Sequence, residues 1–338
     1  MTRPARLVVV LVLLGVGLVA AVTIAVFLGS ARLSPATVLQ VLTGGASAGS
    51  TESVVILSLR LPRISAAALA GGALAVAGVG FQALTRNPLA EPSVLGVSSG
   101  AAFGVVIAQL IGSTGAVVDA LKVTAFGFCG ALVAGAAVYL IASVHGGFPI
   151  QTLLLSGVIV GIFFASAVTV LTSLVDVNRL GGIIHWLLGN IAPLPGPSLL
   201  LFAALAALGF ALIVSQAREL NVLALGEEAA LQLGVNAERL KLQVFVAAAL
   251  LTSSVVAFSG PIGFVGLIVP HILRMLLGPD NRLLVPTAMV GGGIFLLLAD
   301  TVARNIVAPA ELSVGVITSF FGAPFFVYLL RTRHRGVL

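Results

Sequence analysis

A chain of 338 residues with 59% hydrophobic and only 8% charged side chains is unlike a soluble domain, in which about a quarter of the residues are charged. Its mean hydropathy of +1.20 predicts an all-α membrane protein that crosses the bilayer many times, built as one domain over residues 1–338. The net charge of +6 does not indicate nucleic acid binding, because the positive residues fall in short segments between apolar stretches, where membrane topology explains them.

Hydropathy and helix-breaking residues predict ten membrane-spanning helices. Their approximate bounds are 7–28, 63–84, 93–112, 121–142, 151–173, 197–216, 240–259, 262–277, 284–301 and 313–330. Small residues let helices approach closely in lipid, so the Gly- and Ala-rich stretch 66–80 predicts tight packing. The first span is longer than the core of a cleaved signal, so we expect it to be retained, with cleavage as the alternative. The single cysteine, Cys129, lies in an apolar stretch and is expected to be buried.

Lysine and arginine positions orient the chain, because cytoplasmic loops carry an excess of them. With the N-terminus inside, eleven of the 17 Lys and Arg fall in inner segments and six in outer ones, so both termini are predicted to be cytoplasmic. Two outer segments, 29–61 and 174–197, are long enough to have structure of their own. The second predicts a short amphipathic helix that lies at the outer surface.

The most polar segment, 217–239, lies on the cytoplasmic side in this topology. Gly226 and Gly234 bracket a short predicted helix, and Glu227 and Glu228 occupy its first turn, where the helix dipole favours negative charge. An isolated helix of fewer than about 12 residues is marginal in water, so something must hold this one. Two interpretations stay open: a knob that docks into a partner protein, and a capped surface loop between two spans.

Several kinds of chemistry are missing from the chain. The two lysines, Lys122 and Lys241, each follow a leucine, so there is no Walker A motif for binding a nucleotide. Coupled transporters usually keep carboxylates inside their spans. Here the carboxylates fall in loops or at span ends. Asp300 is the one closest to a position inside the membrane, and Arg304, four residues later on the same helix face, can pair with it. The four histidines lack metal-ligand spacing, so we predict no metal site, no cofactor, no catalytic residue and no energy source within the chain.

Five stretches in order resemble the permease subunits of type II ABC importers, the FecCD/BtuC-like family that imports iron–siderophore complexes, haem and cobalamin. They are Leu59–Arg63 (LRLPR), Arg86–Gly100 (RNPLAEPSVLGVSSG), Leu223–Gly234 (LALGEEAALQLG), Gly260–Arg274 (GPIGFVGLIVPHILR) and Glu311–Phe326 (ELSVGVITSFFGAPFF). The resemblance covers nearly the whole chain. It implies ten spans, a dimeric permease around a central path in the bacterial inner membrane, a pair of cytoplasmic ATPases that bind ATP and Mg, and an external binding protein. The second permease is either another copy or a paralogue.

The resemblance also implies roles for individual residues. The segment that would insert into the ATPase comprises Leu225, Gly226, Glu227, Glu228, Ala229, Leu231, Leu233 and Gly234. Its two glutamates would face the ATPase groove while Leu231 and Leu233 pack, and the alternative is that the glutamates only cap the helix. The residues that would dock the binding protein are Arg60, Arg63 and Arg304. The alternatives are interfacial anchors and, for Arg304, a pair with Asp300.

The inner gate is expected at two places. Asn87 and Leu89 lie in the stiff RNPLAEP turn, and Ile150 and Gln151 open the fifth span. The sequence FPIQT at the second place departs from the hydroxyl-rich form of cobalamin transporters. Ser156 follows one turn and a half later and either lines the path or packs against a neighbouring helix.

The resulting hypothesis is the membrane subunit of an ATP-driven importer for a ferric siderophore, with cobalamin or haem as alternative cargo. A secondary transporter of a small organic solute is the rival from another class, and the absence of charges inside the spans argues against it. A non-transporting scaffold or sensor is a third possibility, which the gate-like turn argues against.

Overall fold

The computed structural model describes residues 3–31, 33–45, 47, 49–111, 116–143, 148–175, 177–308 and 310–333, and within these ranges all regular structure is helical. The elements are α1 (Arg3–Phe27), α2 (Pro35–Leu42), α3 (Thr51–Ser53), the π-helix η1 (Val54–Arg60), α4 (Leu61–Leu84), the 3₁₀-helix η2 (Pro92–Leu95), α5 (Val97–Leu110), α6 (Ala116–Ala142), α7 (Ile150–Ser173), α8 (Val177–Leu187), α9 (Gly196–Ser215), α10 (Ala217–Leu223), α11 (Glu227–Gln232), α12 (Ala237–Ser259), α13 (Val265–Leu277), α14 (Asn281–Asn305) and α15 (Val314–Arg333).

Each of the ten predicted spans coincides with one helix, but the helices differ in length. In the described part of the chain, seven are long and apolar enough to cross a membrane. The other three, α5, α13 and the described part of α15, are shorter. Two of these, α13 and α5, begin inside the bundle. Gly266 of α13 packs on Gly78, six residues before the end of α4, and Gly96, which precedes α5, packs on Gly157 and Gly161 in the middle of α7. Non-helical backbone at this depth is tolerated where protein surrounds it.

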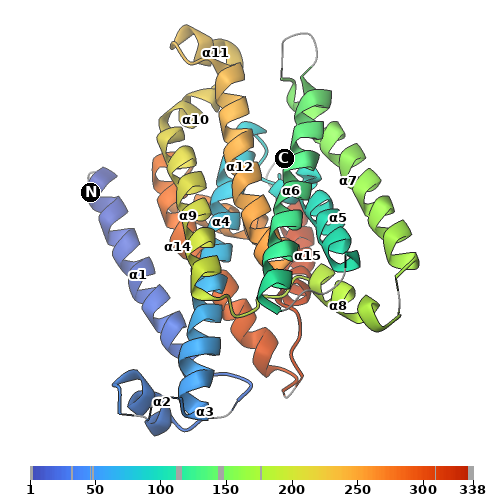
Figure 1. Cartoon of the computed structure of the whole chain (residues 1–338). Coiled ribbons are helices and arrows are strands. Elements are labelled where there is room, and N and C mark those ends of the chain that lie inside the picture. Colours follow the sequence, from blue (N-terminus) through green and yellow to red (C-terminus); the bar gives the residue numbers. More distant parts are fainter. Residues whose placement is uncertain are drawn as a thin grey trace.

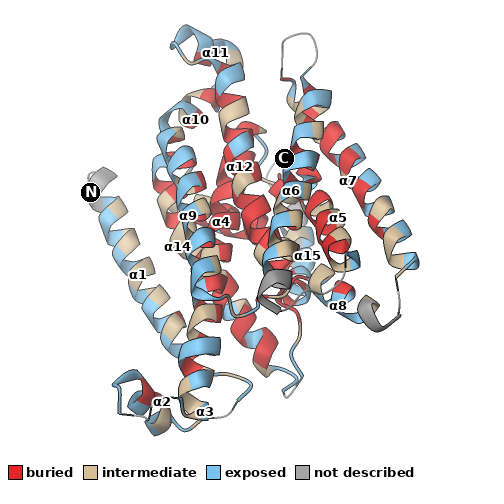
Figure 2. Cartoon of the chain, viewed as in Figure 1, coloured by how far each residue is buried: buried red, intermediate tan, exposed pale blue. Residues whose placement is uncertain are grey.

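Helix α4 is the centre of the bundle, and 83% of its apolar window is buried (Figure 2). It contacts α14, α12, α13 and α9 along its length. Glycines make this possible: a Cβ added at Gly71 would overlap the carbonyl oxygen of Gly292 in α14, and one at Gly78 would overlap that of Gly266. The predicted close packing of the Gly- and Ala-rich second span is therefore confirmed.

The prediction that Cys129 is buried is wrong, because its side chain is exposed on α6. Only 33% of the apolar window of α6 is buried within the chain. In a membrane protein an apolar residue can face lipid or a neighbouring subunit as readily as the core, so hydropathy does not separate these positions.

The two ends of the bundle carry different elements (Figure 1). Helices α10 and α11 lie at one end, toward which α1 begins, and α2, α3 and α8 lie at the other. The short helices predicted between Gly226 and Gly234 and within 174–197 are thus present as α11 and α8, and α10 is a further helix that was not predicted. We call these the α11 end and the α8 end.

Candidate functional site

Helix α11 projects at its end of the bundle beyond the long helices (Figure 1). Gly226 precedes it with φ 118° and Gly234 follows it with φ 81°, both in the region that favours glycine. Three leucines of this segment, Leu225, Leu231 and Leu233, are 69%, 68% and 63% exposed. Between α11 and the start of α12 lies a groove of about 600 Å³, lined by Glu227, Glu228, Leu231, Gly234, Val235, Asn236, Ala237 and Glu238. An apolar, concave surface of this kind suits a protein partner.

Helix α10 anchors this segment to α14. Asn221 donates from Nδ2 to Asp280 Oδ1 at 2.7 Å, and its own Oδ1 accepts from the Asn281 backbone N–H at 2.8 Å. Asp280 also caps α14 by accepting from the Arg282 N–H at 3.1 Å. The hydrogen bond from the Arg282 side chain, helped by Asn221, lowers the pKa of Asp280 to about 2. The base of the projecting segment is therefore fixed.

Glu227 and Glu228 point in different directions. Glu228 is exposed. Glu227 turns toward the bundle, where its Oε2 lies 2.8 Å from Lys241 Nζ and its Oε1 lies 3.7 Å from Arg86 Nη2. The N-cap residue is Gly226, which makes no side-chain cap bond, and both glutamates stand in the first turn of α11, where their charge favours the helix end. Of the two glutamates predicted to face a partner, Glu227 is used mainly within the chain, and Ala229 is half-buried.

The predicted gate residues fall in two segments near this end. Arg86 has φ 49°, and Asn87 Oδ1 accepts from the Leu89 N–H at 3.0 Å, which folds residues 85–91 into a tight turn. Asn87 is exposed and Leu89 is half-buried. Ile150 is half-buried and Gln151 exposed at the start of α7. The structure brings the second segment to α12, since the carbonyl of Phe148 accepts from Lys241 Nζ at 3.3 Å, and the first to α11, since Arg86 lies 3.7 Å from Glu227.

Ser156, also predicted for the path, is 1% exposed within this chain. The next residue, Gly157, packs on the backbone of Val94 and Leu95 in η2. Of the two alternatives for this part of α7, the structure favours packing, because the close approach of two backbones leaves no open surface there.

The three predicted docking arginines lie together toward the α8 end but are not exposed: Arg60 is 4%, Arg63 8% and Arg304 3% exposed. Arg60 donates to the carbonyls of Val26 and Ala31. Arg63 lies 3.0 Å from Asp300 and 2.7 Å from Glu311. They line a pocket of about 190 Å³ with Ser30, Ala31, Val55, Leu59, Pro193 and Glu311.

Arg304 forms the alternative contact weighed for it, with Asp300. Its Nε lies 3.0 Å from Asp300 Oδ2, so the two side chains form an ion pair. The Nε–H donates instead to the Asp300 backbone carbonyl oxygen at 3.4 Å, so the carboxylate itself accepts no hydrogen bond from Arg304. A desolvated guanidinium needs a carboxylate, and Asp300 and Glu311 supply them to Arg63 and Arg304 within the chain. The docking role itself stays a prediction. Burial alone would raise the pKa of Glu311, but Arg63 outweighs it and holds that pKa below its usual value.

Comparison with known proteins decides the class. The model of the FecCD transport family matches residues 17–332. The chain belongs to the FecCD transport family. It is 43% identical over 286 residues to the cobalamin import system permease protein BtuC of Halobacterium salinarum, covering 84% of this chain and 75% of that protein. It is 37% identical over 327 residues to the ferric enterobactin transport system permease protein FepD of Escherichia coli, covering 94% of each.

A solved structure agrees with this FecCD permease in fold. It is an inward-facing conformation of an ABC transporter assigned to the metal-chelate type, with TM-score 0.82, 32% identity, and coverage of 96% of this chain and 99% of that one. FecCD proteins are transmembrane transport subunits of ABC importers and not enzymes, and the ATPase is a separate subunit. Among the described residues, no group of three His, Cys, Asp or Glu is placed to hold a metal ion.

Sequence reasoning missed two polar residues of this FecCD permease. Lys241 is 2% exposed and contacts Glu227, Glu238 and the Phe148 carbonyl around α11. It is one of only two lysines in the sequence, which could have marked it as a residue with a specific role. Glu91 was placed in a loop, yet it accepts hydrogen bonds from the Phe264 N–H, at the start of α13, and from Ser93. No local pattern pairs Glu91 with a helix start so far along the chain.

Proposed function

We propose that the chain is the permease subunit of an ATP-driven importer in the bacterial cytoplasmic membrane, with the α11 end inside and both termini cytoplasmic. A dimer of ABC ATPases that bind ATP and Mg works at the α11 end, and an external binding protein works at the α8 end. A second permease subunit, a copy or a paralogue, completes the path. The observation that carries this proposal is the exposed apolar surface of α11, which a membrane cannot cover if α11 lies beyond the spans.

The ATPase contact would use Leu225, Leu231 and Leu233. All three are at least 63% exposed within one short segment, and neighbouring exposed apolar side chains of this kind mark a protein-binding surface. Exposed Glu228 would add a charge at the rim of the contact. Fixed attachment of α10 to α14 supports a role in transmitting force, because a loosely held segment would move without moving the bundle.

The binding protein would dock over the arginine pocket at the α8 end. Glu311 is the more exposed of the two internal carboxylates, with its side chain 34% exposed against 0% for Asp300. A carboxylate of the binding protein would therefore enter beside Glu311 and share Arg63 with it. Such a contact would weaken as salt rises, because its rim is open to solvent.

The cargo would be a bulky metal chelate, with a ferric siderophore as the first candidate and cobalamin or haem as the others. The relative named for ferric enterobactin supports a siderophore, and the relative named for cobalamin import supports cobalamin. The turn that holds Asn87 and Leu89 and the entry to α7 at Ile150 and Gln151 would close the cytoplasmic side of the path.

Affinity purification from the native host tests the proposal. We expect an ABC ATPase to co-purify with the wild-type chain and to be lost in Leu231→Asp. The matched control is Leu39→Asp on α2, where a leucine 54% exposed lies at the opposite end. Retention of the ATPase by Leu231→Asp, or equal loss in Leu39→Asp, would contradict the assignment. Uptake that depends on a proton gradient at constant ATP would favour a secondary transporter instead.

A further inference from the structure

Lys241 joins three segments at the α11 end. Its Nζ donates to Glu227 Oε2 on α11 at 2.8 Å, to the Phe148 carbonyl oxygen before α7 at 3.3 Å, and to Glu238 Oε1 in its own helix at 2.8 Å. An ammonium has three donors, so all of them are used. The other oxygen of Glu227 lies 3.7 Å from Arg86 Nη2, in the turn 85–91.

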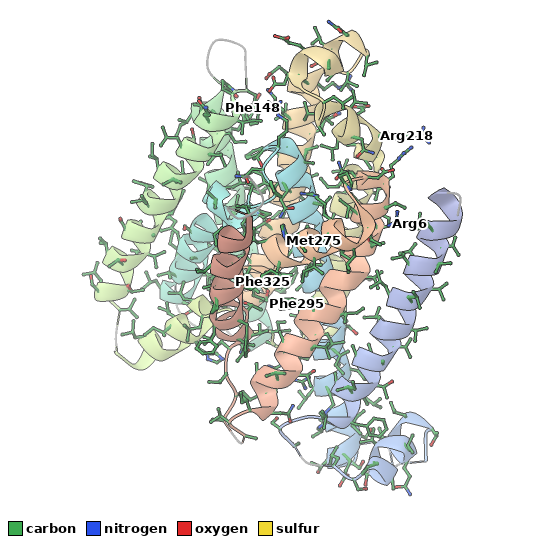
Figure 3. The ribbon with its side chains drawn as sticks, turned by 180° about the vertical axis from the view of Figure 1, so that it is seen from behind. Arg6, Phe148, Arg218, Met275, Phe295 and Phe325 are labelled. Atoms are coloured by element: carbon green, nitrogen blue, oxygen red, sulfur yellow. The ribbon has the colours of Figure 1, made fainter. Side chains whose placement is uncertain are left out.

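The acceptor at Phe148 is held firmly. Its ring is 4% exposed and lies between Tyr139 of α6 and Phe245 of α12, with ring centroids 5.8 Å and 5.7 Å away. Phe148 lies toward the same end of the bundle as Arg218 of α10 (Figure 3). A shift of Lys241 is thus passed to the start of α7 through a packed contact.

We propose that Lys241 and Glu227 form a link that makes α11 and the start of α7 move as one body, with the turn 85–91 attached more weakly through the exposed Arg86–Glu227 pair. This rests on the proposed function, in which α11 receives force from an ATPase and the two other segments close the path. Lys241 is then a positioning residue, since it touches neither cargo nor nucleotide. Most exposed ion pairs are worth too little to transmit force. This one differs because the Lys241 side chain is only 2% exposed and its ammonium contacts three acceptors at once.

Two substitutions separate the link from the fold. Lys241→Met keeps an unbranched side chain in the buried site, and the carboxylates it releases, Glu227 and Glu238, are 39% and 46% exposed and can be hydrated. Removing one partner of an ion pair is strongly destabilising only where the other charge stays buried, and here the remaining charges reach water. Glu238→Gln is the matched control. Glu238 lies at the same 2.8 Å from Lys241 but on the same helix, so weakening this contact releases no second segment.

The test is a distance distribution between spin labels, measured by pulsed electron paramagnetic resonance on the purified chain. In a Cys129→Ser background, labels at Gln232 on α11 and Gln151 on α7 occupy exposed positions. We expect a narrow distribution in the unsubstituted background and in Glu238→Gln, and one at least twice as broad in Lys241→Met and Glu227→Gln. The double variant should be little broader than Lys241→Met, because Lys241→Met already removes the contact between Lys241 and Glu227 that Glu227→Gln weakens.

An unchanged width in Lys241→Met, or equal broadening in Glu238→Gln, would overturn the link. The measurement needs no ATPase, so it is separate from the co-purification test: a chain that shows the link but binds no ATPase refutes the proposed function alone. In the assembled importer, with ferric enterobactin, haemin and cyanocobalamin as probes, Lys241→Met should transport about tenfold less cargo per ATP while ATP hydrolysis stays within about twofold. Unchanged transport per ATP would overturn the positioning role.

Discussion

Asp300 and Glu311 pair with the same arginine but should differ widely in what they contribute to stability. Asp300 is 0% exposed and lies 3.0 Å from both Arg63 and Arg304. At an effective dielectric of about 20, each of these contacts has a gross attraction of about 5–6 kcal/mol, most of which offsets the cost of desolvation. Asp300→Asn keeps the shape and leaves two buried guanidiniums without their shared carboxylate, which costs about 3–5 kcal/mol.

Glu311→Gln is the internal comparison. Its carboxylate lies 2.7 Å from Arg63, closer than Asp300 does, yet its side chain is 34% exposed and water can replace it. We expect a cost of about 1 kcal/mol or less. The free energy of unfolding would be measured by titrating the purified chain in mixed micelles with a denaturing detergent. Equal costs for the two variants, or a larger cost for Glu311→Gln, would refute the reasoning, because burial would then not decide the energy.

Three further outcomes follow from the same structure. Gly71→Ala should lower the free energy of unfolding by about 1–3 kcal/mol, because its Cβ meets the backbone of Gly292, whereas Gly15→Ala, with nothing within 4 Å, should be neutral or slightly stabilising in the same titration. Asp280→Ala should cost about 1 kcal/mol as a lost helix cap. The pKa of Asp280 is lowered to about 2, so its contribution to stability is complete above the unfolded value of 3.8 and is lost as pH falls from there through about 2. The difference in unfolding free energy between Asp280→Ala and wild type should therefore stay constant between about pH 7 and pH 5. A change in that range would contradict the assignment. Cys129, being exposed, should react with a lipid-soluble maleimide before any unfolding, and reaction only after unfolding would contradict its placement.

The helices could be predicted because membrane-length apolar runs and their breakers are local signals. The same holds for α11, whose glycines and first-turn glutamates lie within one short stretch. The length of α5, expected over 93–112, could not be predicted, since hydropathy does not reveal that its chain enters the bundle before the helix begins, whereas the short span 262–277 was predicted close to α13. Exposure of Cys129 escaped prediction for a related reason, that lipid and protein core select the same residues.

For the charged residues, the direction in which each side chain points was harder to predict than the helix on which it lies. The helix dipole explains why Glu227 stands in the first turn of α11, but its direction depends on Lys241 and Arg86, which come from other elements. Arg63 likewise meets Asp300 and Glu311 only after α4 and α14 have packed. A motif shared across a family marks such residues without saying whether their charge faces a partner or the interior. Burial decides between the two: Arg63 and Glu227 are held by partners inside the chain, so a protein that bound to either would have to compete with an internal ion pair, whereas exposed Glu228 is open to a partner.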